Sequence, residues 1–411
     1  MQMTRNWIFA GLGVLFLGGC SWFSWIPGIG DEPDPLEPRK LVKFDAEVKI
    51  NRLWKRSVGE GLGRKYLRLQ PVVLADRIYA GDGYGRLQAH DRFTGKRIWQ
   101  SKFEGDDNDG GFFSSLNFID RKDPSFVSGG IGAGGGRILV GTTSGEVVAF
   151  AAGDGVEEWR SNVGSEVLAP PITGDDMVFV QTIDGRLLAL EQDSGEIRWS
   201  YDIQVPVLTL RGTATPVYDG GVVYAGFANG TMSAVIATNG QPIWEHRLML
   251  PEGRSELDRM VDVDASPLVR GPLVYGVAYQ GKVKALRRSD GQGLWELDIS
   301  SYLDIGEGYG YIYLVDDEDT IVAIDQQSAE EVWRQDGLAR RKLSSPVVFS
   351  NYVAVGDADG YLHIIAQSDG RFLARRKLDG DGLRSSMVYT DGTLYVLGNS
   401  GSLHALEITV R

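Results

Sequence analysis

A unit of four short strand-like segments recurs eight times along this chain, which predicts an all-β fold, an eight-bladed β-propeller of four-stranded antiparallel blades. Two further observations support this fold class. Glycine accounts for 54 of the 411 residues, so turns must be frequent. The eighth unit reaches the C-terminus without its fourth segment, and a matching segment near the N-terminus predicts closure by an N-terminal strand that completes the last blade.

Each unit is recognised by a turn residue that follows an apolar strand. The eight turn residues are Gly85, Gly145, Gly185, Gly230, Gly281, Asp319, Gly360 and Gly401. A small residue, Ala in seven units, follows four positions later. Fourteen positions after the turn, six units carry Trp99, Trp159, Trp199, Trp244, Trp295 and Trp333, whereas the seventh carries Ala374.

The four segments of a unit are interpreted as strands a to d. Strand a starts at a position that is Pro in five units, where the missing N–H of proline is tolerated. Strand b runs into the turn, strand c contains the small residue, and strand d carries the Trp. We expect each Ala to leave room for an indole from a neighbouring blade, an interblade wedge that contributes a few kcal/mol. Trp54 stands where the Trp of the eighth blade should, which predicts the closing strand near residues 48–57.

The N-terminus reads as a targeting segment. Arg5 precedes an apolar run over residues 7–17, which is too short to span a membrane and ends in small residues, so residues 1–19 are predicted to be a signal peptide. The Leu-Gly-Gly-Cys sequence that ends at Cys20 resembles a bacterial lipobox. That resemblance implies that Cys20 becomes the acylated first residue, and that Ser21 favours sorting to the outer membrane. An ordinary signal peptide with a coincidental Cys is the alternative.

The mature chain is expected to have two parts. Residues 20–44 would be the acylated Cys and a flexible tether, since prolines are frequent there. Residues 45–411 would form the propeller.

Composition excludes several classes of function. The formal net charge is −13 and no basic stretch stands out, so nucleic acid is not an expected partner. A single Cys cannot form an internal disulfide, and the sequence shows no zinc-binding spacing, phosphate-binding loop or serine-hydrolase motif. His363 and His404 share a register in adjacent blades, but two His without a third ligand do not predict a metal site. No cofactor or metal is therefore expected.

Length variation is confined to the connections between strand d of one blade and strand a of the next. These connections share a face with the b-to-c turns, and loops held by a rigid scaffold are favoured places for binding residues. Leu208, Leu210 and Arg211 follow Trp199, and Asp262 and Asp264 lie in the next blade's connection. Alternate residues of an extended segment point the same way, so the two loops predict a contact patch with an apolar centre and a charged margin. The alternative is that the Leu side chains pack beneath the loop and Arg211 pairs inside the protein.

The motif AxDxxTGxxxW, clearest from Ala89 to Trp99, resembles the repeat of pyrroloquinoline-quinone enzymes. One implied function is a periplasmic quinoprotein dehydrogenase, a family that uses a catalytic Asp, calcium ligands and usually a vicinal Cys pair. With one Cys, already assigned to the lipid, this chain cannot form that pair. The other implied function is that of the BamB family of outer-membrane protein assembly factors, lipoprotein propellers with these repeats and no cofactor.

The resemblance to the BamB family extends over the whole mature chain and includes the sequences at 208–212 and 257–264. It implies a non-enzymatic scaffold anchored to the periplasmic side of the cell outer membrane, within the β-barrel assembly machinery. The implied partner is the barrel-inserting subunit BamA, whose periplasmic POTRA domains would contact Leu208, Leu210, Arg211, Asp262 and Asp264. Other lipoproteins of the same complex and unfolded outer-membrane proteins are further expected partners.

Overall fold

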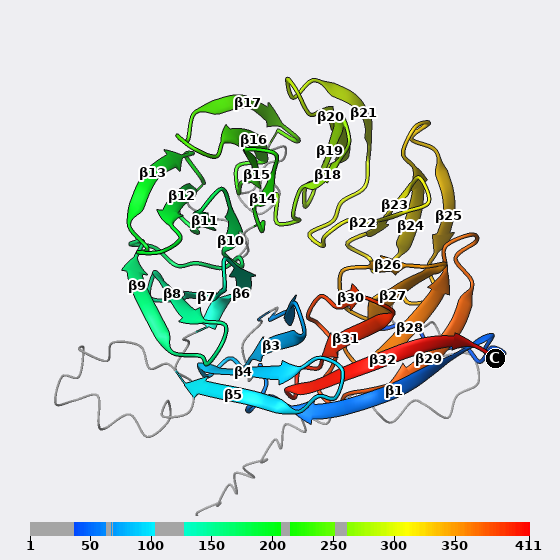
Figure 1. Ribbon diagram of the computed structural model, residues 1–411. Coiled ribbons are helices and arrows are strands. Elements are labelled where there is room, and N and C mark those ends of the chain that lie inside the picture. Colours follow the sequence, from blue (N-terminus) through cyan, green and yellow to red (C-terminus); the bar gives the residue numbers. More distant parts are fainter. Residues whose placement is uncertain (1–36, 63–66, 68, 103–126, 207–213, 251–260) are drawn as a thin grey trace, which may run out of the picture. The chain divides into compact units, whose positions relative to one another are not determined.

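The computed structural model describes residues 37–411 except 63–66, 68, 103–126, 207–213 and 251–260. Residues from Pro38 to Arg411 form one compact unit. Its strands assemble into eight four-stranded antiparallel sheets placed around a ring, as Figure 1 shows. The predicted eight-bladed β-propeller is therefore confirmed. Within the described ranges, no helix is long and apolar enough to cross a bilayer.

The strand bounds follow the repeat closely. Blades 1 to 4 comprise β2 (Val72–Leu74), β3 (Arg77–Gly81), β4 (Arg86–Asp91), β5 (Arg97–Lys102); β6 (Val127–Gly134), β7 (Arg137–Thr142), β8 (Glu146–Ala151), β9 (Glu157–Asn162); β10 (Ile172–Gly174), β11 (Met177–Gln181), β12 (Arg186–Glu191), β13 (Ile197–Asp202); and β14 (Val217–Asp219), β15 (Val222–Gly226), β16 (Thr231–Ile236), β17 (Pro242–Arg247). Blades 5 to 8 comprise β18 (Leu268–Arg270), β19 (Leu273–Val277), β20 (Val283–Arg287), β21 (Gly293–Leu297); β22 (Gly306–Gly308), β23 (Tyr311–Val315), β24 (Ile321–Asp325), β25 (Glu331–Gln335); β26 (Val347–Phe349), β27 (Tyr352–Gly356), β28 (Tyr361–Ala366), β29 (Phe372–Lys377); and β30 (Val388–Thr390), β31 (Thr393–Leu397), β32 (Ser402–Val410), β1 (Val48–Ser57).

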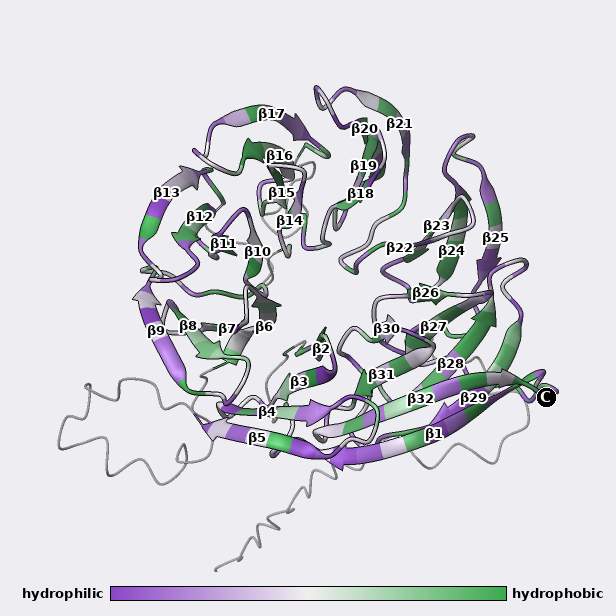
Figure 2. Cartoon of the chain, in the orientation of Figure 1, coloured by the Kyte–Doolittle hydropathy of each residue, from purple (hydrophilic) through white to green (hydrophobic). Residues whose placement is uncertain are grey.

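The core lies between the blades. Strands b and c are the most buried in each blade; in β12 the four central residues, Leu-Leu-Ala-Leu, are all buried. Strand d is mostly exposed, and Figure 2 shows hydrophilic residues on β9 and β13 against hydrophobic residues on middle strands such as β8 and β16. Each blade therefore buries both faces of its middle strands against its neighbours and leaves its outer strand at the rim.

Strand β1 closes the ring. It pairs antiparallel with β32, from Val48 opposite Val410 to Ser57 opposite Ser402, and Figure 1 shows the blue and red ends of the chain side by side. Trp54 stands opposite Ala405, which is the register that the repeat requires. The predicted completion of the last blade by the N-terminal strand is confirmed, and every blade therefore has four strands.

The Trp residues link successive blades, but the sequence predicts each indole beside the Ala of a neighbouring blade, whereas the Ala and the Trp that stand opposite each other belong to one blade. The small Ala of strand c stands opposite the Trp of its own blade, as Ala323 does opposite Trp333. The indole N–H of Trp333 donates to the Gln367 carbonyl of the next blade at 2.8 Å. The room for the ring comes from the c-to-d turn of that blade, where a Cβ on Gly370 would lie 2.6 Å from the indole Cε3. The indole therefore caps the neighbouring turn.

Seven indoles make the same hydrogen bond to a main-chain carbonyl of the next blade. The donors are Trp54, Trp99, Trp159, Trp199, Trp244, Trp295 and Trp333. The exception, Ala374, lies in blade 7, which faces blade 8. Blade 8 has no c-to-d hairpin, because its strand d comes from the N-terminus. The missing Trp therefore coincides with the missing turn that would receive it.

The four histidines of the chain provide a test of how the fold depends on pH. Burial lowers the pKa of His90, His246, His363 and His404, and brings that of His404 to about 4. Each neutral ring stabilises the fold above about pH 6.5, and this stabilisation is lost as the pH falls, because the unfolded chain binds protons first.

We predict that His404→Gln flattens the decline in stability on acidification. Between about pH 6.5 and 4 the native protein should lose about 3 kcal/mol more than the variant, since each pKa unit corresponds to about 1.4 kcal/mol. Chemical denaturation at a series of pH values measures this difference. Parallel pH curves for the two proteins would contradict the prediction.

Candidate functional site

The connections from strand d to strand a share one face with the b-to-c turns, which we call the connection face. Hydrogen bonds join the two sets of loops: Ile203 N donates to Gly185 O at 2.9 Å and Leu248 N donates to Gly230 O at 2.8 Å. Antiparallel strands of constant length bring these loops together, so the face arises directly from the repeat. The described ends of these two connections therefore lie on the face of the ring that carries the b-to-c turns.

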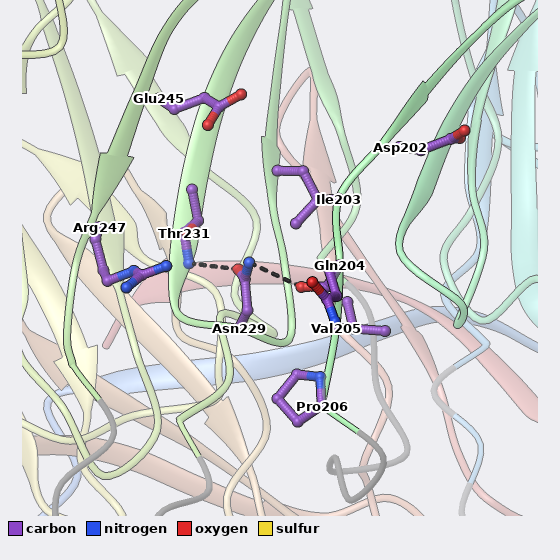
Figure 3. Close-up of a pocket in the computed structure, with 9 residues that line it drawn as sticks. All are labelled: Asp202, Ile203, Gln204, Val205, Pro206, Asn229, Thr231, Glu245 and Arg247. Atoms are coloured by element: carbon purple, nitrogen blue, oxygen red, sulfur yellow. Dashed lines mark hydrogen bonds between the residues drawn. The ribbon is translucent and has the colours of Figure 1, made fainter.

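A cleft of about 510 Å³ opens on this face between blades 3 and 4. Its lining residues, drawn in Figure 3, are Asp202, Ile203, Gln204, Val205, Pro206, Asn229, Thr231, Glu245 and Arg247. The turn of blade 4 holds the connection in place, because Asn229 Nδ2 donates to Gln204 O at 3.1 Å. Asn229 Oδ1 in turn accepts from Thr231 N at 3.0 Å. One wall of the cleft is thus the start of the connection that continues through residues 207–213.

The cleft combines apolar and charged surface. Ile203 and Val205 are half-buried, whereas Asp202, Glu245 and Arg247 are exposed. A buried hydroxyl orients one of the carboxylates, since Tyr201 Oη donates to Glu245 Oε1 at 2.5 Å. Burial and then this hydrogen bond raise the pKa of Tyr201, so its hydroxyl stays a neutral donor. Apolar patches with a charged margin are typical of contacts between proteins.

The second connection packs against the same turn of blade 4. Val263 N donates to Phe227 O at 3.4 Å, and both Val261 and Val263 are buried. Asp262 O accepts from Tyr279 N at 2.8 Å, which ties the segment to blade 5 as well. The turn at 227–230 thus holds both connections, one through Asn229 and the other through Phe227. The predicted neighbourhood of the two connections holds for their described parts.

The predicted site residues fall into two groups. Leu208, Leu210 and Arg211 lie outside the described residues, as does Cys20. Asp262 and Asp264 are both described, but they differ in solvent exposure: Asp262 is 2% exposed, whereas Asp264 is half-buried. The flanking Val261 and Val263 side chains are buried too, so residues 261–263 have no exposed face.

Sequence reasoning missed the residues that line the cleft. Asn229 precedes a Gly and marks a turn, yet nothing in the sequence shows that its side chain reaches the preceding connection. Arg247 and Glu245 lie on an outer strand, where charged residues are ordinary. The only signal that could have found them is their position on β17, the strand that leads directly into the long connection after blade 4.

Among the described residues, no group of three or more His, Cys, Asp or Glu side chains could hold a metal ion. The two histidines that share a register have other contacts. His363 Nε2 lies 2.9 Å from Asp357 Oδ2, and His404 Nε2 lies 3.2 Å from Ser402 Oγ.

Comparison with known proteins decides the family. A family model described as outer membrane protein assembly factor BamB matches residues 83–335 and 317–410. The chain belongs to the BamB family. BamB of Pseudomonas aeruginosa is 41% identical over 373 residues, which cover 91% of this chain and 93% of that protein. BamB of Yersinia pestis is 34% identical over 405 residues, with 98% and 99% covered, and BamB of Escherichia coli is 33% identical over 406 residues, with 99% and 100% covered.

Solved structures agree with the BamB assignment. The crystal structure of BamB from Moraxella catarrhalis superposes with a TM-score of 0.76 at 25% identity, covering 87% of this chain and 100% of that one. A quinohemoprotein alcohol dehydrogenase from Comamonas testosteroni gives a TM-score of 0.68 at 14% identity, covering 87% and 76%. The likeness to the dehydrogenase shows a shared fold alone. The resemblance to BamB that the sequence motifs indicated is confirmed.

Proposed function

We propose that this BamB-family protein is a non-enzymatic scaffold lipoprotein of the outer-membrane β-barrel assembly machinery. In this proposal acylated Cys20 holds the protein on the periplasmic side of the outer membrane. The connection face of blades 3 to 5 binds the POTRA domains of the barrel-inserting subunit BamA, and the complex assists the delivery and insertion of outer-membrane proteins. The relatives are named outer membrane protein assembly factors, which supports a role in the assembly of outer-membrane proteins.

The observation that carries the binding proposal is the convergence of two connections on one turn of blade 4. Asn229 and Phe227 hold Gln204 and Val263, so the described ends of the two connections are fixed before a partner arrives, which lowers the entropic cost of association. In this arrangement Leu208 and Leu210 supply the apolar centre of the contact, and Arg211 supplies charge at its margin. Asp264, which is half-buried, would contribute a negative charge to this margin, while buried Asp262 supports the segment that presents it.

The quinoprotein dehydrogenase is not favoured by the site. The chain has one Cys in total, so it cannot form the vicinal Cys pair usual in that family. The cleft beside blade 4 instead resembles a protein contact in its mixture of half-buried aliphatic and exposed charged side chains.

Affinity purification from solubilised outer membranes tests the proposal. The tagged full-length protein should co-purify with BamA and with other lipoproteins of the assembly machinery. A matched strain in which Cys20→Ala removes the acylation site should retain the soluble interaction but lose the membrane association. Recovery of the acylated protein without BamA would contradict the proposed function.

A further inference from the structure

The first described residues run across the outer strand of blade 7, and we call residues 39–47 the N-terminal strap. The strap starts on the connection face, where Arg39 N donates to Ala339 O at 3.0 Å in the connection between blades 6 and 7. It ends at the opposite side of the blade, where Glu47 N donates to Leu373 O at 2.9 Å, and it then continues as β1. Residues 39–44, which the sequence assigns to the flexible tether, therefore contact the propeller.

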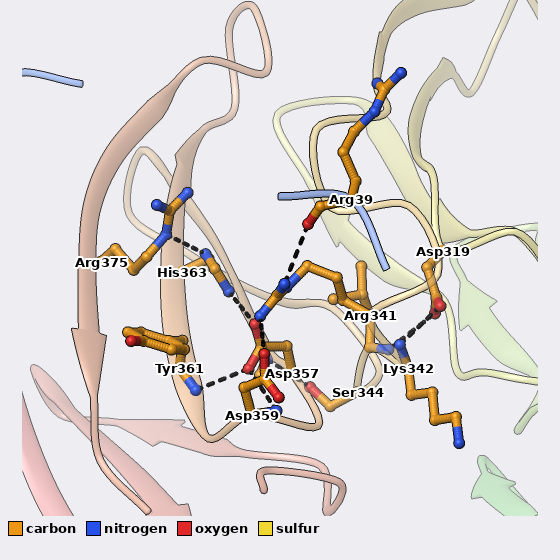
Figure 4. A network of polar contacts seen from close by, with 12 residues as sticks. Arg39, Asp319, Arg341, Lys342, Ser344, Asp357, Asp359, Tyr361, His363 and Arg375 are labelled. Carbon is orange, nitrogen blue, oxygen red and sulfur yellow. Dashed lines mark hydrogen bonds and ion pairs between the residues drawn. The ribbon is translucent and has the colours of Figure 1, made fainter. Parts of the chain in front are cut away.

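Two arginines hold the strap by its main chain. Arg341 Nη1 donates to the Arg39 carbonyl at 3.1 Å, and Arg375 Nη1 donates to the Val42 carbonyl at 2.9 Å. Figure 4 shows Arg341 pointing at the Arg39 carbonyl from within the propeller. Contacts to carbonyls position an extended peptide without depending on its side chains.

A buried network behind the strap orients both guanidinium groups. Arg341 Nε donates to Asp357 Oδ2 at 2.8 Å, and His363 Nε2 lies 2.9 Å from the same oxygen. Arg375 Nε donates to His363 Nδ1 at 3.0 Å, so the ring must be neutral with its proton on Nε2. Asp357 and His363 are completely buried and the side chain of Arg341 is only 6% exposed. Figure 4 shows the chain of contacts from Arg375 through to Arg341.

Stability alone gives little reason for such a network, because the desolvation of buried charges offsets most of their attraction. What the network does supply is a fixed direction for two donors. The same guanidinium of Arg375 also lies 5.1 Å from the ring of Phe44 and 5.3 Å from that of Phe372, and the two rings stack at 5.5 Å. The strap is thus held through main-chain carbonyls and one aromatic side chain.

We infer that Arg341, Asp357, His363 and Arg375 form a peptide clamp, a binding site for an extended segment that the chain's own residues 39–44 occupy. The clamp fixes the point at which the N-terminal segment joins the propeller, and it places that point on the connection face. The clamp does not rest on the proposed function, because all four of its side chains and the strap residues they contact are described.

Amide hydrogen exchange of the full chain tests the clamp. Arg375→Met removes one donor, and Arg334→Met is the matched control, because Arg334 lies at the equivalent position on the outer strand of blade 6 and pairs there with exposed Glu331. We expect exchange at the strap amide of Glu47, which donates to Leu373 O, to rise about tenfold or more in Arg375→Met, the effect of losing a charge-assisted hydrogen bond, and to stay unchanged in Arg334→Met.

A second variant and a second readout keep the outcome decisive. Arg341→Met should raise exchange at the Arg39 amide, which donates to Ala339 O, in the same way, and circular dichroism should show the native sheet content in both variants. Unchanged exchange of the strap in both variants would overturn the clamp. Co-purification of BamA is measured on the same samples: unchanged exchange with BamA still captured overturns the clamp alone, whereas failure of the native protein to capture BamA overturns the proposed function alone.

Discussion

Replacing Trp333 by Ala should lower the free energy of unfolding by about 3–5 kcal/mol. The indole is 9% exposed, it donates to the next blade at Gln367, and it lies 5.8 Å from the ring of Tyr313. Its removal leaves a cavity at the contact between blades 6 and 7, because Gly370 has no side chain to fill the space. Urea denaturation of the purified protein measures the loss.

The neighbouring residue provides the control. Val332 is 42% exposed on the same strand, and Val332→Ala should cost less than about 1 kcal/mol. Equal costs at the two positions would mean that the Trp series consists of ordinary surface residues, and that the contacts between blades do not depend on the indoles.

The second large effect concerns the closing strand. A chain that begins at Val58 should fail to form the native propeller, because β32 would expose a nine-residue edge and the loss of Val48, Ile50 and Trp54 would uncover the residues they pack against. The expected result is aggregation and the absence of a cooperative melting transition in calorimetry.

A circular permutant separates the need for the strand from the need for its position in the sequence. Val410 stands opposite Val48, so an Asn-Gly pair can join them as a two-residue hairpin, with new termini between Ser57 and Val58. This permutant should fold and melt within a few degrees of the native chain. Native-like melting of the truncated chain, or failure of the permutant to fold, would contradict closure by β1.

The repeat made most of the fold predictable, because the turn and Trp positions occur at constant offsets in nearly every unit. The same regularity located strand β1 from Trp54 alone. The partner of each indole was not predictable, since Ala and Trp at fixed spacing do not reveal whether the two share a blade. The strap was missed for a related reason: proline content indicated a tether, whereas its contacts with Arg341 and Arg375 join residues about three hundred positions apart.

The candidate site was predictable in its location and less so in its detail. Topology alone places successive connections on one face, so the two loops around blade 4 were expected to be neighbours. The burial of Asp262 depends on Val261 and Val263 packing against the turn of blade 4, which no local pattern encodes. Charged residues of the cleft look like ordinary rim residues in the sequence.

The affinity of the purified POTRA domains of BamA for the soluble protein tests the central claim most directly. Leu208→Ala combined with Arg211→Ala should weaken binding at least tenfold, about 1.4 kcal/mol, while the melting temperature stays unchanged. The control is Arg287→Ala at the end of β20, beside the c-to-d turn of blade 5 and on the face opposite the connections, which should bind as the native protein does. Undiminished affinity of the double variant, or an equal loss for Arg287→Ala, would contradict binding through the connection face.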